Sequence, residues 1–150
     1  MWSTRFSPAV RHPDEEYPYF PGYEHEGGEA QHAGFNQNIP LNLGTTDWAV
    51  YASALSQGVE AIKKFGPDWL VVSPGLDTFE KNPVASFKLT SADYLGMGEV
   101  IASLRLSTHF VFEGGYAIDE PGVNTANVLI GFEGFWAKIS FSWITTITNE

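Results

Sequence analysis

The chain has 150 residues, no cysteine and a formal net charge of −10. This length is sufficient for one domain with a hydrophobic core, and without cysteine any metal ligand must be Asp, Glu or His. The negative charge argues against nucleic acid as a direct partner, because phosphate binding needs a basic surface.

The N-terminal stretch MWSTRFSPAV contains no apolar segment of the length found in signal peptides. No run of the sequence reaches the roughly 20 apolar residues that span a bilayer. We therefore expect a soluble, cytoplasmic protein with no membrane partner. The sequence leaves the oligomeric state open.

Residues 1–44 are rich in Pro, Gly, aromatic residues and acids, with no clear period. This composition predicts a long loop, which in a compact domain is usually functional. Near its end, the stretch GFNQNIPL predicts a short extended segment. The acidic run at residues 14–16 is interpreted as solvated surface, or alternatively as a patch that attracts a cationic substrate.

A first helix is expected to begin at a cap on Thr45 or Thr46 and to end at Gly66, which Pro67 follows. Apolar residues at helical spacing give it one apolar face: Tyr51, Leu55, Val59 and Ile62. The next stretch, WLVVS at residues 69–73, is almost continuously apolar. This pattern predicts a strand that is buried on both faces of a parallel sheet.

A second helix is predicted to begin at Thr90, with Asp93 completing a capping box. Its apolar stripe consists of Tyr94, Met97, Val100, Ile101 and Leu104. A second buried strand is predicted in THFVFEGG, with residues 109–112 at its centre. The alternation of helices and apolar strands indicates an α/β fold with a parallel sheet.

A third helix is predicted from about Pro121 to Phe132, with four apolar residues facing inward: Val123, Ala126, Leu129 and Ile130. Residues 134–150 are apolar and rich in residues that favour strands. We interpret this tail as an edge strand, or as a terminus without its natural partner.

Asp77 and Tyr116 each lie just past one of the two predicted strands. Ligands of open α/β sheets bind beyond the carboxyl ends of the strands, so the two residues are expected to meet at one edge. There a carboxylate can hold a cation and a phenol can donate a hydrogen bond to an oxyanion. Gly114 and Gly115 give the tyrosine freedom of orientation. The alternative is that Asp77 only caps a turn and Tyr116 is a packed aromatic.

None of the four histidines is adjacent to another histidine in the sequence. We interpret His12, His25 and His32 as exposed loop residues; the alternative is that His12 or His25 folds over to Asp77 as a replacement metal ligand. His109 falls within a predicted buried strand and is interpreted as a core histidine with a backbone partner.

Four stretches, YPYFPGY, GFNQNIPLNLGT, VVSPGLDTFEKNPVASFKLTSADYLGMGEVIASL and VFEGGYAIDEPGVNTANVLIGFE, carry a resemblance to a known family. The chain resembles the C-terminal half of the histone deacetylase and acetylpolyamine amidohydrolase superfamily. The likeness covers about residues 17–133 of a single partial domain at residues 1–150, and residues 134–150 form an atypical tail. It implies an arginase-like parallel sheet with helices on both faces.

The resemblance also implies a reaction: zinc-dependent hydrolysis of the acetyl-amide bond of acetyl-lysine or of an acetylpolyamine. Asp77 matches the last zinc ligand of the family, and Tyr116 matches the tyrosine that polarises the substrate carbonyl. Gly114 and Gly115 match the flexible glycines of that loop.

The sequence departs from the family pattern in two ways that matter for catalysis. It contains neither the Asp-x-His motif that supplies further zinc ligands nor the adjacent histidine pair that serves as general base and acid. We therefore expect a fragment that retains one ligand, does not hold zinc and is inactive alone. The alternative is a non-catalytic α/β interaction module.

Overall fold

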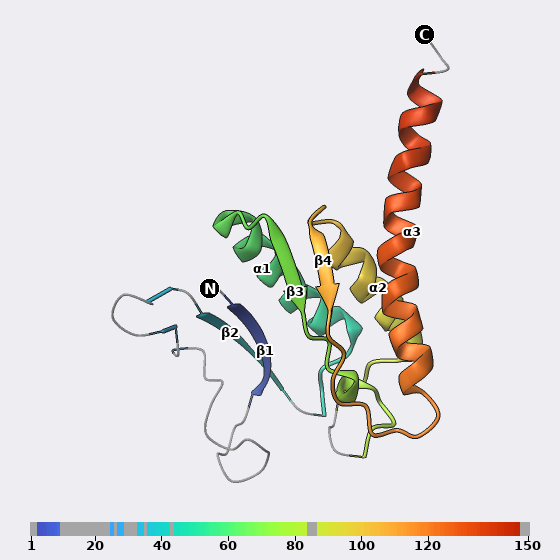
Figure 1. Cartoon of the computed structure of the whole chain (residues 1–150). Coiled ribbons are helices and arrows are strands. Elements are labelled where there is room, and N and C mark those ends of the chain that lie inside the picture. The colour runs from blue at the N-terminus through green and yellow to red at the C-terminus, as the bar shows by residue number, and fades with distance from the viewer. Residues whose placement is uncertain are drawn as a thin grey trace.

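A computed structural model of the chain describes residues 3–9, 25, 27–28, 33–34, 36–42, 44–83 and 87–147. Strands and helices alternate along the chain after the first two strands (Figure 1). The elements are β1 (Ser3–Ala9), β2 (Asn36–Asn42), α1 (Trp48–Phe65), β3 (Trp69–Val72), the 3-10 helix η2 (Leu76–Thr78), α2 (Ser91–Ala102), β4 (Ser107–Phe110) and α3 (Pro121–Ile147).

The strands form two parallel pairs. Strand β1 pairs with β2, so that residues 3–9 align with residues 36–42. Strand β3 pairs with β4, and Trp69 aligns with Ser107. The predicted parallel α/β arrangement is confirmed, as is the extended segment at β2. The prediction of one long loop over residues 1–44 is wrong at β1, because backbone pairing with β2 holds a stretch that has no periodic pattern of its own.

Helix α1 begins one residue later than expected. Its N-cap is Asp47, whose carboxylate accepts a hydrogen bond of 3.1 Å from the amide of Val50. The Thr46 hydroxyl is already engaged, because it donates to the carbonyl of Asn42 at 2.7 Å. Gly66 ends the helix as predicted, in the left-handed conformation with φ 69°.

Helix α2 begins as predicted. The Asp93 carboxylate accepts hydrogen bonds from the Thr90 amide at 2.7 Å and from the Thr90 hydroxyl at 2.8 Å. The expected capping box is therefore present. Tyr94, Met97 and Ile101 on its inner face are buried in the main core, which also receives side chains from α1, β2 and α3.

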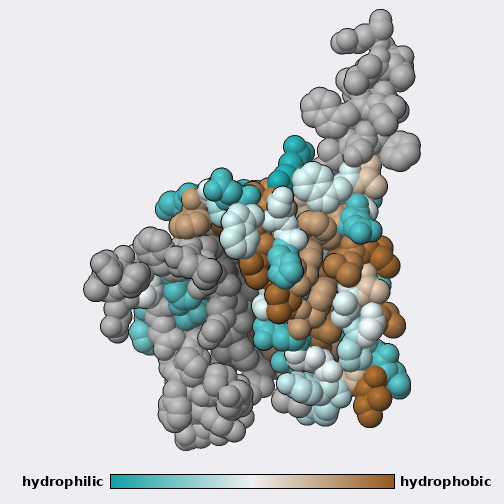
Figure 2. All heavy atoms as spheres, in the orientation of Figure 1, coloured by the Kyte–Doolittle hydropathy of each residue, from teal (hydrophilic) through white to brown (hydrophobic). Residues whose placement is uncertain are grey.

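Strands β3 and β4 are buried on one face only. Leu70 and Val72 pack against the core, whereas Trp69 is 58% and Val71 is 50% exposed. His109 on β4 is also exposed, so its interpretation as a core histidine is wrong. The prediction that both faces of these strands are buried is therefore wrong. An apolar sequence does not reveal whether a second layer of structure covers the sheet. Figure 2 shows apolar side chains gathered on this face.

Helix α3 is longer than predicted and faces another way. It continues through residue 147, so the edge strand expected after residue 133 is wrong; no proline interrupts this stretch. Its inner face carries Val128 and Gly131, whereas the four residues predicted to face inward are all exposed: Val123, Ala126, Leu129 and Ile130. Gly98 and Gly131 decide this orientation, because each lacks a side chain where the backbone of the facing helix passes. Figure 1 shows the end of α3 extending beyond the other elements.

Within the described residues, no helix combines the length and the apolar character needed to cross a membrane.

Candidate functional site

The segments that follow β3 and β4 continue side by side. The amide of Leu76 donates to the carbonyl of Glu113 at 2.8 Å, and the amide of Glu113 donates to the carbonyl of Pro74 at 3.2 Å. Gly75 and Glu113 form a parallel bridge beyond the named strands. The carboxyl ends of both strands therefore open onto one edge of the sheet, where α/β proteins bind their ligands.

Asp77 lies on η2 at this edge, and its side chain reaches the loop that follows β4. A Cβ built on Gly114 would lie 3.1 Å from Cγ of Asp77. The carboxylate thus rests against the glycine that stands two residues before Tyr116.

Tyr116 follows a sharply turned segment and is 58% exposed. Gly114 has φ 68° and Gly115 has φ 86°, a region that side chains rarely adopt. A Cβ on Gly115 would lie 2.8 Å from Cβ of Leu76, so the path of the loop also requires glycine for space. The roles of Asp77 as a ligand and of Tyr116 as a hydrogen-bond donor remain predictions.

Two residues that the sequence analysis did not assign to the site hold η2 in place. Asn82 donates from Nδ2 to the carbonyl of Asp77 at 2.6 Å. The hydroxyl of Tyr94, which is fully buried, lies 2.9 Å from the Thr78 hydroxyl and donates to the Leu76 carbonyl at 3.3 Å. The available signal was the phenol of Tyr94 within an apolar stripe, because a buried tyrosine hydroxyl needs a polar partner.

Burial dominates the electrostatics of the site. It raises the pKa of the Asp77 carboxyl above the ordinary value of 3.8; a hydrogen bond from its own backbone opposes the shift and the charge of Glu113 adds to it. Burial also raises the pKa of Tyr51 to about 12, to which the charge of Asp77 contributes. A cation bound nearby would lower the pKa of Asp77, because it would favour the charged form of the carboxyl group.

The residues that the structure describes do not complete a zinc site. Among them, no group of three His, Cys, Asp or Glu side chains is placed to hold a metal ion. His25 lies in an exposed turn and His109 on the exposed face of β4, while His12 and His32 lie outside the described residues. Asp77 can supply one oxygen ligand, whereas a catalytic zinc needs three protein ligands.

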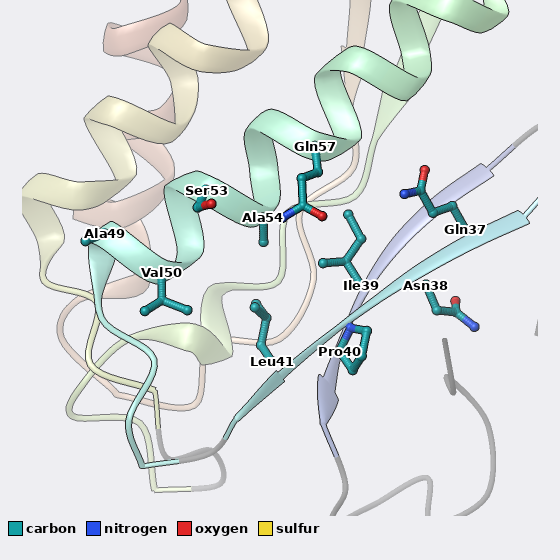
Figure 3. A pocket seen from close by; sticks show the side chains of 10 residues that line it. All are labelled: Gln37, Asn38, Ile39, Pro40, Leu41, Ala49, Val50, Ser53, Ala54 and Gln57. Atoms are coloured by element: carbon teal, nitrogen blue, oxygen red, sulfur yellow. The ribbon is translucent and has the colours of Figure 1, made fainter. Parts of the chain in front are cut away.

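A separate cavity of about 810 Å³ lies between β2 and α1. Figure 3 shows Ile39 and Leu41 of β2 pointing toward α1, and Gln57 of α1 pointing toward β2. Neither Asp77 nor Tyr116 lines this cavity. None of its lining residues was predicted from the sequence to have a functional role.

Comparison with known proteins relates the whole arrangement to deacetylases. The sequence-family model named histone deacetylase domain matches residues 9–131 of this chain. Acetylpolyamine amidohydrolase 2 of Pseudomonas aeruginosa is 50% identical over 122 residues, which cover 81% of this chain and 35% of that protein. Acetylpolyamine amidohydrolase of Mycoplana ramosa is 44% identical, with coverage of 81% and 36%.

A solved structure agrees with these sequence relatives. The acetylpolyamine aminohydrolase from Burkholderia pseudomallei superposes with a TM-score of 0.82 and 28% identity, over 89% of this chain and 38% of that one. The chain therefore spans about a third of the length of the curated relatives it matches.

Proposed function

Because the chain belongs to the histone deacetylase family, we propose that it supplies one part of a zinc-dependent site that hydrolyses acetyl-amide bonds. Asp77 is the zinc ligand that this part contributes. Tyr116 donates a hydrogen bond from its phenol to the oxygen of the amide carbonyl as negative charge develops there. Gly114 and Gly115 allow the loop to direct the tyrosine.

The observation that carries this proposal is the contact between two loops distant in sequence. The carboxylate of Asp77 rests against Gly114, and the bond between Leu76 and Glu113 fixes the two loops relative to each other. A metal ligand and a hydrogen-bond donor that act on one carbonyl group must be held within a few ångströms of each other. Their position on two loops that share one edge of the sheet supports this proposal.

We propose that these 150 residues alone neither retain zinc nor hydrolyse the substrate. The sequence contains no Asp-x-His motif and no adjacent histidine pair. Loss of an outer hydrogen-bond partner already costs about 10–100-fold in metal affinity, so loss of two direct ligands costs more. Loss of the acid–base pair removes a further factor of about 10²–10⁴ in rate.

The substrate that we propose for the completed site is an acetylated polyamine, with acetyl-lysine as the competing possibility. The names of the relatives from Pseudomonas aeruginosa and Mycoplana ramosa support this choice. The net charge of −10 supports it as well, because an acidic surface attracts polycations.

One observation favours the second candidate function, a non-catalytic interaction module. Trp69, Val71 and Val111 form an exposed apolar surface on β3 and beyond β4, and a surface of this kind often marks a site of protein association.

Metal analysis and an activity assay distinguish the two candidates. The purified chain is assayed alone and after co-expression with the N-terminal part of the Pseudomonas aeruginosa relative, with an acetylpolyamine and an acetyl-lysine peptide as substrates. We expect zinc and activity only in the pair, both lost in Asp77→Ala and kept in Asp68→Ala, an exposed control. A stable pair without zinc or activity would favour the interaction module, and tight zinc with hydrolysis in the chain alone would contradict the proposed inactivity.

A further inference from the structure

The carboxylate of Asp77 lies between two glycines that come from different loops. Gly75 precedes it in the loop after β3, and Gly114 belongs to the loop after β4. We propose that Gly75 and Gly114 are positioning residues, which together set the orientation of the Asp77 side chain by leaving space on both sides of it. The functional meaning of this orientation rests on the proposed role of Asp77.

Gly75 is required by the side chain of Asp77 and not by its own backbone. A Cβ at this position would lie 2.7 Å from Oδ1 of Asp77, closer than atoms in van der Waals contact. The backbone of Gly75 has φ −76° and ψ 116°, which any residue adopts without strain. Alanine is therefore compatible with the chain path here and incompatible only with the present position of the carboxylate.

Gly114 limits the other side of the same group. Its Cβ would lie 3.1 Å from Cγ and 3.2 Å from Oδ2 of Asp77. Each carboxylate oxygen thus faces one glycine. Unlike Gly75, Gly114 also needs glycine for its backbone, because φ is 68°. Gly75 is consequently the position at which the effect on the carboxylate can be measured without backbone strain.

The two glycines keep a constant separation because the loops are bonded to each other. Gly75 bridges Glu113, the residue directly before Gly114, and the Leu76 amide donates to the Glu113 carbonyl at 2.8 Å. Asn82 holds the backbone of Asp77 itself through a bond of 2.6 Å to its carbonyl. Because the backbone is fixed at these points, we expect the clash between a methyl group on Gly75 and the Asp77 carboxylate to be relieved mainly by rotation of the Asp77 side chain.

A double-mutant cycle tests this inference. Gly75→Ala is compared with wild type, and Gly75→Ala/Asp77→Ala with Asp77→Ala, by urea unfolding of the 150-residue chain. We expect Gly75→Ala to raise the unfolding equilibrium constant about tenfold in the wild-type background and to have little effect when the carboxylate is absent, because contacting residues couple in such cycles. Gly122→Ala is the matched control, since no atom lies within 4 Å of its added Cβ.

A spectroscopic measurement separates orientation from general stability. Three-bond couplings of labelled Asp77 report its χ1 rotamer, which we expect to change in Gly75→Ala and to remain unchanged in Gly122→Ala. An unchanged rotamer with equal losses in both backgrounds would overturn the inference. If Gly75→Ala does not fold, folding of the double variant supports the inference and its failure to fold overturns it. Neither readout depends on activity, so the proposed function can fail while this inference stands.

Discussion

The hydroxyl of Tyr94 on α2 lies 2.9 Å from the hydroxyl of Thr78 on η2. The same phenol donates to the Leu76 carbonyl at 3.3 Å, and Tyr94 has no exposed surface. A polar contact inside the apolar face of α2 therefore anchors the turn that carries Asp77.

Removal of the Tyr94 hydroxyl should destabilise the turn. Tyr94→Phe removes the partner of the Leu76 carbonyl and one of two partners of the Thr78 hydroxyl, which still donates to the Gly75 carbonyl at 3.2 Å. Loss of a hydrogen-bond partner by a buried polar group costs about 1–3 kcal/mol. We expect urea unfolding to show a loss of that size. Tyr116→Phe is the control, because Tyr116 is 58% exposed; an equal loss in both variants would contradict the anchoring role of Tyr94.

Truncation of a core leucine should be far more costly than truncation of a surface one. Leu89 is fully buried, whereas Leu129 on α3 is 39% exposed. We expect Leu89→Ala to lower the free energy of unfolding by about 2–5 kcal/mol, since it leaves a cavity. Leu129→Ala should cost less than half as much, and thermal or urea unfolding of the two variants side by side measures the difference.

The contact between α2 and α3 depends on a glycine. A Cβ on Gly131 would collide with the Leu95 carbonyl, whereas no atom lies within 4 Å of a Cβ on Gly134. We predict that Gly131→Ala destabilises the chain by about 1–3 kcal/mol through overpacking. Gly134→Ala in the same helix should stabilise it by about 0.5–1 kcal/mol through helix propensity. Circular dichroism during thermal unfolding checks both signs, and a stable Gly131→Ala variant would show that the helices can separate without cost.

The stability of the chain should fall in strong alkali because of Tyr51. Burial raises the pKa of Tyr51 from 10.0 to about 12, so the folded state favours the neutral phenol. The neutral phenol of Tyr51 contributes its full share to the free energy of unfolding below pH 10, and this share is lost as the pH rises to about 12. At 1.36 kcal/mol per pKa unit it amounts to about 3 kcal/mol.

Urea unfolding between pH 9 and 12 measures this loss. We expect the free energy of unfolding of Tyr51→Phe to fall less steeply over that interval than that of wild type. Parallel pH profiles for the two proteins would show that Tyr51 ionises in the folded state as easily as in the unfolded state.

Local interactions made part of the fold predictable from sequence. The capping box of Thr90 and Asp93 and the left-handed Gly66 lie where the sequence predicts them, because their bonds join residues a few positions apart. The alternation of helices with apolar strands likewise predicted the parallel pair of β3 and β4.

The faces of these elements could not be predicted in the same way. Val123 and Ile130 were expected inside and are exposed, whereas Val128 and Gly131 face α2. Helical periodicity defines an apolar stripe, but the choice between neighbouring stripes depends on which one lets two helices approach most closely. The exposure of Trp69 and Val71 similarly depends on whether another layer covers the sheet.

For the candidate site, the sequence by itself determined that Asp77 and Tyr116 each follow a strand, because the apolar run before each residue ends at a recognisable turn. Only the tertiary structure decided that Gly75 and Gly114 lie on either side of the Asp77 carboxylate. The physical reason is that this contact depends on the register between β3 and β4, which aligns Trp69 with Ser107 and carries Gly75 to Glu113. That register results from packing and backbone pairing between distant segments, which no local pattern in the sequence encodes.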